Sequence, residues 1–355
     1  MTSGNYVLIG KYTNPRGFGD AGLLSMYAAS TATKVYIFIG GTVEANGNAF
    51  QLFMKLPGST GVPVGTALPA ATGGTSLSGN TSKMDMAVTA ALALRGSNAA
   101  SPSTFYVEGA SYTNATTGAS AKLSTTNFAG DGTAVTIPTT TGYTMFTSAR
   151  TAYKNTTSGG VAANPGNVTP NTSANYGGAG SFGWEIELDR TAAGLTGATP
   201  LTLFVLQNSG AGNYISSDFI PQTSSPLTTN SGNLATGSFD FTTLAGLQYA
   251  TVNIAAAGGT TLGTKAADAA ALGLSVFPNP VQATSTVAYQ VTGQATNVKI
   301  ALTDLLGRTV RTVENGVKPV GAQTATLNTA DVAAGTYLVR VQVGEQVATS
   351  KIAVL

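Results

Sequence analysis

The sequence contains no cysteine and no histidine. Zinc sites built on thiolates, cysteine or histidine nucleophile systems and imidazole general bases are therefore excluded, and without histidine a conventional serine triad cannot form. No segment reaches the roughly 18 consecutive apolar residues that a membrane span requires. No charged stretch followed by an apolar stretch stands at the first residues, so we expect any signal peptide to have been removed already.

Charge is scarce as well. Charged residues make up 9% of the 355 residues, against about 25% in an ordinary soluble domain. The formal net charge is +2, and lysine and arginine occur singly, so no nucleic-acid footprint is present. Hydrophobic residues reach 43%, which is enough for real cores. The surface must then consist mainly of Thr, Ser, Asn, Gln and Gly, a composition typical of secreted adhesins, surface layers and extracellular fibres.

The apolar residues follow the pattern of strands. They alternate over short runs that are divided by Gly, Asn, Ser, Thr and Pro, and helical periodicity is almost absent. An Asn-Gly pair at 46–47 predicts a hairpin between strands over 34–40 and 49–56. We predict an all-β protein with a large antiparallel, jelly-roll-like sandwich at 1–257, a linker at 258–272 and a small immunoglobulin-like sandwich at 273–355.

Two segments inside the large domain lack strand patterning. They cover residues 57–80 and 151–180 and are rich in Gly, Thr, Ser, Asn and Pro. Loops of that length are usually functional or disordered.

The C-terminal domain carries three motifs in order. A Phe-Pro-Asn-Pro start is followed by an Asp-Leu-Leu-Gly-Arg turn and then by a Gly-Thr-Tyr-Leu-Val-Arg-Val strand. Their marking residues are Phe277, Pro278, Asn279, Pro280, Asp304, Gly307, Arg308, Gly335 and Tyr337. Together the motifs resemble the type A C-terminal sorting domain of the type IX secretion system of Bacteroidota. The resemblance implies the secretion machinery as a partner, passage across the outer membrane, and surface attachment or release, often with removal of this domain.

The N-terminal domain has a looser resemblance. Segments such as Asn-Gly-Asn-Ala-Phe at 46–50 and Gly-Trp-Glu-Ile-Glu-Leu at 183–188 look like a secreted bacterial β-sandwich that is distantly similar to DOMON and carbohydrate-binding sandwiches. That resemblance implies a fold and says little about function.

One predicted strand, at 184–189, carries acidic residues at alternate positions. The side chains of Glu185, Glu187 and Asp189 would share one face, and the apolar side chains the other. Three carboxylates spaced about 6.5–7 Å apart along a strand could bind calcium, the one cofactor that the sequence suggests, or supply the paired acids of a glycoside hydrolase. The ordinary alternative is a charged face in water, neutralised by Arg190 and by cross-strand partners.

Aromatic residues give a weaker signal. Tyr153 and Tyr176 lie in a predicted loop, where they could stack on sugar rings or pin the loop to the sandwich. Trp184 is the only tryptophan, and its position in the alternation places it in the core.

These observations predict a non-enzymatic protein that is extracellular or on the outer cell surface. Our first interpretation is a self-assembling structural subunit of a surface layer, sheath or filament, associating through sheet edges or loops. The first alternative is a carbohydrate-binding or adhesive module for a surface glycan, which would present a concave face with two or more exposed aromatic rings. The second is a carboxylate-dependent glycan-active enzyme, in which Glu187 or Asp189 would face another carboxylate across a pocket.

Overall fold

A computed structural model describes residues 6–12, 22–44, 46–98, 103–155, 182–221, 233–244, 247–262, 272–291, 295–304, 308–343 and 346–355. The chain divides into two compact units, Met1–Gly263 and Thr264–Leu355. The predicted linker at 258–272 overlaps the first unit, because Thr260–Leu262 form a strand of that unit. No helix in the described residues is long and apolar enough to cross a membrane.

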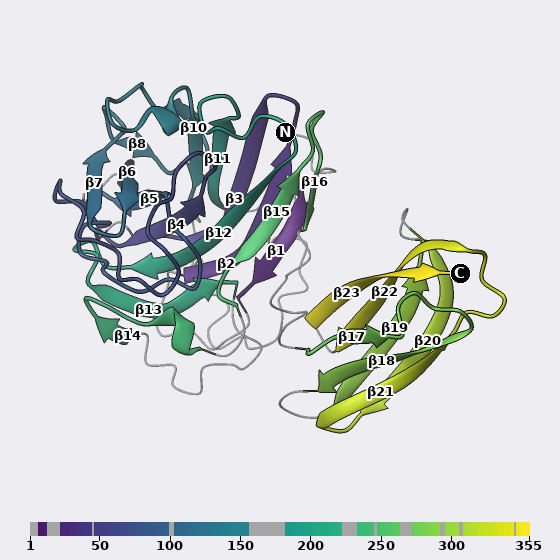
Figure 1. The fold of residues 1–355 in the computed structure, drawn as a ribbon. Helices are drawn as coiled ribbons and strands as arrows, with labels where there is room; N and C mark the ends of the chain where they lie inside the picture. The colour runs from purple at the N-terminus through teal and green to yellow at the C-terminus, as the bar shows by residue number, and fades with distance from the viewer. Residues whose placement is uncertain are drawn as a thin grey trace. The chain divides into compact units, whose positions relative to one another are not determined.

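The N-terminal unit contains two antiparallel sheets (Figure 1). The first sheet has the order β1-β2-β3-β11-β10-β9. Its strands are β1 (Val7–Lys11), β2 (Gly22–Ser30), β3 (Lys34–Thr42), β9 (Val135–Thr136), β10 (Arg150–Lys154) and β11 (Gly183–Asp189).

The second sheet has the order β14-β13-β12-β4-β5-β6-β7, with β15 and β16 added beside β12 and β8 beside β6. Its strands are β4 (Ala49–Lys55), β5 (Ala90–Gly96), β6 (Thr104–Asn114), β7 (Thr117–Lys122), β8 (Phe128–Ala129), β12 (Thr199–Asn208), β13 (Tyr214–Ile220), β14 (Asn233–Thr236), β15 (Ala250–Ile254) and β16 (Thr260–Leu262). Two short 3-10 helices, η2 (Thr144–Phe146) and η3 (Phe241–Thr243), lie in the connections.

The predicted hairpin at Asn46-Gly47 is wrong. The turn has the expected backbone, with a φ of 96° at Gly47, and the Glu44 carboxylate accepts hydrogen bonds from the side-chain amides of Asn46 and Asn48. However, β3 and β4 belong to different sheets. The turn therefore carries the chain from one layer of the sandwich to the other.

The main core lies between the two sheets. Alternate residues of each strand enter it, as a period of two requires, and they include Ile37, Ile39, Trp184, Ile186, Leu188, Leu203 and Val205. The Trp184 indole N–H donates to Thr151 Oγ1 at 2.6 Å, so its one polar atom is satisfied inside the core. The prediction that Trp184 is a core residue is confirmed.

A second core covers the other face of the larger sheet. Apolar residues of segment 57–89 and of the region around η3 pack onto Phe53, Phe204 and Phe219. The residues that segment 57–89 contributes are Val62, Leu68, Ala71, Leu77, Met84, Met86 and Val88. Residues 57–89, which include the predicted loop at 57–80, therefore form a packed third layer, which we call the cover segment. Of the predicted loop at 151–180, residues 151–154 belong to β10, and residues 156–180 lie outside the described residues.

The C-terminal unit is a small sandwich of two sheets, ordered β17-β18-β21 and β20-β19-β22-β23. Its strands are β17 (Ser275–Phe277), β18 (Thr284–Val291), β19 (Thr296–Thr303), β20 (Thr309–Lys318), β21 (Gly321–Asn328), β22 (Gly335–Val343) and β23 (Gln346–Val354). Valine and isoleucine side chains from both sheets form its own core. The all-β fold with a large sandwich and a small immunoglobulin-like one is as predicted.

Candidate functional site

Strand β11 has the predicted alternation. Glu185, Glu187 and Asp189 point away from the core and are partly exposed, while the apolar residues between them are buried. On its neighbour β3, Phe38 lies opposite Glu185, Tyr36 opposite Glu187 and Lys34 opposite Asp189. These six positions share the outer surface of the smaller sheet.

Two basic side chains neutralise most of the acidic charge. The Lys34 ammonium lies 3.1 Å from Asp189 and 3.9 Å from Glu187, and the Arg150 guanidinium lies 3.8 Å from Glu187. Asp189 also accepts hydrogen bonds from the backbone N–H groups of Thr191 and Ala192, both at 3.0 Å. Those backbone donors, the Ala192 N–H foremost, together with Lys34, lower the pKa of Asp189 below its ordinary value.

The candidate calcium ligands Glu185, Glu187 and Asp189 stay a prediction that this geometry does not support. The Lys34 ammonium sits between Glu187 and Asp189, where a bound cation would be expected. Among the described residues, no group of three or more acidic side chains is arranged to hold a metal ion.

Arg190 has a different role from the one predicted. It is buried, and its guanidinium pairs with no carboxylate in the described residues but donates to the backbone carbonyls of Leu195, Thr31, Ala255, Ala256 and Gly197 at 2.6–3.3 Å. A planar group with five N–H donors is suited to this arrangement. Arg190 therefore ties together three separate turns of the N-terminal unit.

Aromatic rings flank the carboxylates on the same surface. Tyr27 of β2 lies opposite Phe38, with ring centroids 6.3 Å apart, and Tyr36 lies beside Glu187. All three rings are partly exposed. With Tyr6 they form what we call the aromatic–acidic face, made of Tyr6, Tyr27, Tyr36, Phe38, Glu185 and Glu187.

Two glycines position the ring of Phe38. A Cβ atom at Gly183 would meet Phe38 Cζ at 2.9 Å, and one at Gly40 would meet Phe38 Cε1 at 3.5 Å. Gly40 and Gly183 are cross-strand partners, so together they leave a shallow shelf in the sheet. The ring lies against this shelf and keeps its other side toward the surface.

Tyr6 crosses the same face from the segment before β1. Its hydroxyl donates to Glu185 Oε1 at 2.5 Å, and burial together with that carboxylate raises the pKa of Tyr6. Ala29, which lies on the outer side of β2, is buried, so its small side chain leaves room for Tyr6. For Tyr36, burial and then the Glu187 carboxylate raise the pKa.

Tyr153 is not an exposed sugar-stacking residue. It is fully buried on β10, packs edge-on against Phe105 at a centroid distance of 4.6 Å, and its hydroxyl accepts from the Val43 N–H at 2.9 Å. It fixes the connection after β3, which agrees with the pinning alternative. Tyr176 lies outside the described residues.

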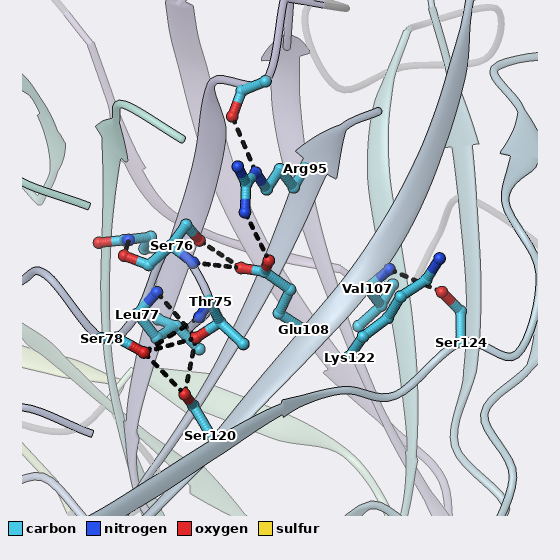
Figure 2. A network of polar contacts seen from close by, with 12 residues as sticks. Thr75, Ser76, Leu77, Ser78, Arg95, Val107, Glu108, Ser120, Lys122 and Ser124 are labelled. Atoms are coloured by element: carbon cyan, nitrogen blue, oxygen red, sulfur yellow. Dashed lines mark hydrogen bonds and ion pairs between the residues drawn. The ribbon is translucent and has the colours of Figure 1, made fainter. Parts of the chain in front are cut away.

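A buried polar network holds the cover segment in place (Figure 2). The Glu108 carboxylate on β6 accepts from the Ser76 N–H at 2.8 Å and from the Ser76 hydroxyl at 2.5 Å, and it pairs with Arg95 at 3.0 Å. Beside it, the hydroxyls of Thr75, Ser78 and Ser120 bond to one another. Every oxygen of Glu108 thus has a structural partner, and Ser76 donates its proton to a carboxylate that is already engaged.

The sequence reasoning missed this network and most of the aromatic–acidic face. Glu108 is an isolated acid in an apolar strand. Because a buried acid needs a partner, this lone acid and the arginine on the neighbouring strand were the available signal for the network. For the face, the signal was the alternation of Tyr36 and Phe38 with Val35, Ile37 and Ile39, which places two aromatic rings on the side away from the core.

In the C-terminal unit, the predicted motifs lie near one end of the sandwich, where β22 begins and where β19 and β23 end. Asn279 bridges to β23, donating to the Lys351 carbonyl at 3.1 Å and accepting from the Ala353 N–H at 3.0 Å. The Pro278 carbonyl accepts from Ser285, and Val281 pairs with Val354. The opening motif therefore locks the start of this unit against its last strand.

The other motif residues shape turns. Asp304 accepts from the backbone N–H of Arg308 at 2.9 Å and pairs with its guanidinium at 2.6 Å. Gly335 begins β22, and the Tyr337 hydroxyl donates to the Ala333 carbonyl at 2.9 Å, closing the turn before it. Phe277 is half exposed at the end of β17. Gly307 lies outside the described residues.

Comparison with protein families identifies this unit. Residues 275–355 match the family described as "Secretion system C-terminal sorting domain". The C-terminal unit is a type IX sorting domain. The chain is therefore a cargo of the type IX secretion machinery, with which its sorting domain interacts, and it is exported to the cell surface or the extracellular space.

Solved structures show only distant similarity. Dimeric latent PorU from Porphyromonas gingivalis is 12% identical, with 99% of this chain and 34% of that chain covered and a TM-score of 0.19. PorZ from the same organism is 14% identical, with 75% and 37% covered and a TM-score of 0.18. The chain thus spans about a third of the length of these two proteins. A biofilm-associated protein BSP domain is 9% identical, with 99% and 52% covered and a TM-score of 0.19. No curated protein matches the chain.

Proposed function

We propose that the exported chain is a non-enzymatic binding module of the cell exterior and that it contacts its ligand through the aromatic–acidic face. The observation that carries the proposal is the row of partly exposed rings, Tyr27 and Phe38, directly beside Tyr36 and the Glu187 carboxylate. Exposed aromatic rings with a few fixed polar groups are the usual composition of a binding surface.

The carboxylates support binding in preference to catalysis. A glycoside hydrolase needs two carboxyl groups that face each other about 5–10 Å apart across the substrate. Here Glu187 is neutralised by Lys34 and Arg150, and Glu185 accepts from Tyr6 on the same open sheet surface. Glu108, a buried acid on β6, is engaged by Ser76 and Arg95.

The test is co-sedimentation of the purified full chain with cell envelopes of a type IX-competent bacterium. The double substitution of Tyr36→Ala and Phe38→Ala should weaken binding at least about tenfold, since central aromatic anchors dominate interface energies. Tyr106→Ala is the matched control, because Tyr106 is a partly exposed ring on β6 of the other sheet. Equal binding by the double variant and the wild-type chain would refute the proposed face.

A structural subunit is a second candidate function, and one observation favours it. In the sorting domain, β20 and β21 end their respective sheets, and β20 is ten residues long with Val310 and Val317 45% and 70% exposed. A long edge strand offers a row of backbone groups to another chain.

Light scattering across a range of salt concentrations tests that candidate. Association through paired strands would persist at high salt, because few of its contacts are ionic. A monodisperse monomer at high protein concentration would remove the candidate and leave the binding module.

A further inference from the structure

We propose that the ligand of the aromatic–acidic face is a neutral saccharide chain. This inference rests on the proposed function, because it names the ligand chemistry of the same face. Three properties of the face lead to it, namely an apolar platform of two aromatic rings, hydrogen-bond acceptors beside that platform, and nearly balanced charge.

The platform is built by Phe38 and Tyr27. Because Gly40 and Gly183 leave a shelf, the Phe38 ring lies against the sheet and does not stand away from it. Tyr27 continues the platform on the neighbouring strand, with its ring tilted by 49°. One face of a pyranose ring consists of C–H groups, and it packs on an aromatic ring with the same gain that any apolar surface obtains.

The acceptors are placed where a stacked sugar would direct its hydroxyls. Glu185 lies in the same cross-strand row as Tyr27 and Phe38, and Glu187 lies in the next row beside Tyr36. Ionised carboxylates accept hydrogen bonds from hydroxyls more strongly than neutral groups do. The Tyr6 hydroxyl already makes such a bond to Glu185, which shows that this carboxylate accepts from an O–H group on this face.

The charge balance favours a neutral ligand. The three acidic groups Glu185, Glu187 and Asp189 stand beside the two basic groups Lys34 and Arg150, so that only one formal negative charge is left without a basic neighbour. Such a face has no strong field to attract a polyanion or a polycation. A polyhydroxyl ligand, whose groups both donate to carboxylates and accept from Lys34 and Arg150, matches it better.

The experiment uses the full chain and the same envelopes after two separate treatments. Periodate, which cleaves vicinal diols of sugars, should abolish binding, and protease treatment should leave it. In parallel, the chain is applied to a microarray of neutral and sulfated oligosaccharides. It should bind neutral ones, and the affinity should change little between low and high salt.

Single variants then assign roles. Phe38→Ala should weaken binding to the best neutral oligosaccharide at least about tenfold, and Glu185→Gln, which preserves shape and removes the charge, about tenfold. Thermal unfolding shows whether Phe38→Ala folds. If it does not, Tyr36→Ala provides a second ring variant at a site without the glycine shelf. Tyr106→Ala should bind like the wild-type chain.

The outcomes separate this inference from the proposed function. Envelope binding that needs Tyr36 and Phe38 but survives periodate and is lost after protease would keep the face and replace the saccharide by a protein partner. Binding to sulfated oligosaccharides alone would overturn neutrality. Binding that ignores the face variants altogether would overturn the proposed function and this inference together.

Discussion

The strands at the sheet edges differ in length between the two units of the chain. In the N-terminal unit, the strands that end or border the sheets are two to six residues long, namely β1, β7, β8, β9, β14 and β16, and the cover segment packs on one face of the larger sheet. In the sorting domain, β17 is three residues long, but the other three strands that end the sheets, β20, β21 and β23, are eight to ten residues long.

Short edge strands prevent unwanted strand pairing, whereas long ones permit it. The edge strands of the N-terminal unit thus offer shorter rows of backbone groups to a partner than β20, β21 and β23 of the sorting domain do. Export and the proposed ligand binding therefore need not share a surface. A protein partner of the sorting domain would recognise main chain, and a ligand of the N-terminal unit would recognise side chains.

The largest expected effect tests whether export resides in the sorting domain alone. Residues 272–355 fused to an unrelated reporter with a signal peptide should bring it to the surface of a type IX-competent bacterium, because this segment contains the sorting motifs and their core, including the buried Leu272. Surface labelling of intact cells measures the result. Reporter that stays in the periplasm, while a known sorting domain is exported in parallel, would show that export needs residues outside the sorting domain.

The second prediction separates the stability of the units. Arg190→Met should reduce the free energy of unfolding of the N-terminal unit by about 4 kcal/mol, because the buried carbonyls that Arg190 satisfies lose their donors. Guanidinium unfolding of the full chain measures it, and the transition of the sorting domain should not move. Arg150→Met is the control, since Arg150 is an exposed arginine of the same unit and should change stability by less than about 1 kcal/mol.

A third, smaller effect should appear at the cover segment. Glu108→Gln should cost about 2 kcal/mol, because an amide N–H₂ group would then face the donors of Ser76 or Arg95. Limited proteolysis should cut within 57–89 sooner than in the wild-type chain. Unchanged proteolysis of the cover segment together with unchanged stability would mean that apolar packing alone holds the third layer.

Sequence reasoning predicted what depends on local pattern and missed what depends on register. The alternation of Trp184 with Glu185 and Glu187 is local, and so are the motifs around Asn279, Asp304 and Tyr337. Tyr27, Phe38 and Glu185 lie on three paired strands, and the third is far from the other two in the sequence. No local sequence pattern indicates which strands are neighbours in a sheet.

The other errors have the same physical origin. The cover segment has no strand alternation because it packs as an irregular layer, so its spaced apolar residues resembled a solvent-exposed loop. Arg190 follows three acids at alternate positions, which suggested an ion pair. In the fold, the chain turns after Asp189, and Arg190 enters a pocket of backbone carbonyls.

The smallest effect compares one carboxylate in each unit. The pKa of Asp189 is lowered mainly by the backbone N–H of Ala192, whereas the pKa of Asp331 is lowered first by its bond to Arg311. A lowered folded-state pKa means that the stabilisation is fully present above the ordinary value of about 4 and is lost as pH falls through the folded-state pKa. Asp189→Asn and Asp331→Asn should therefore each destabilise their own unit at pH 7 and have little effect near pH 2, with the Asp189 effect below about 1 kcal/mol.

Salt should distinguish the two substitutions, because mobile ions screen the exposed Asp331–Arg311 pair but cannot replace the backbone donors that are fixed beside Asp189. The free energy of unfolding is measured at both pH values, with and without 1 M salt, at which the Debye length is about 3 Å. If salt removed both effects equally, the distinction between a backbone-held and a side-chain-held carboxylate would be wrong.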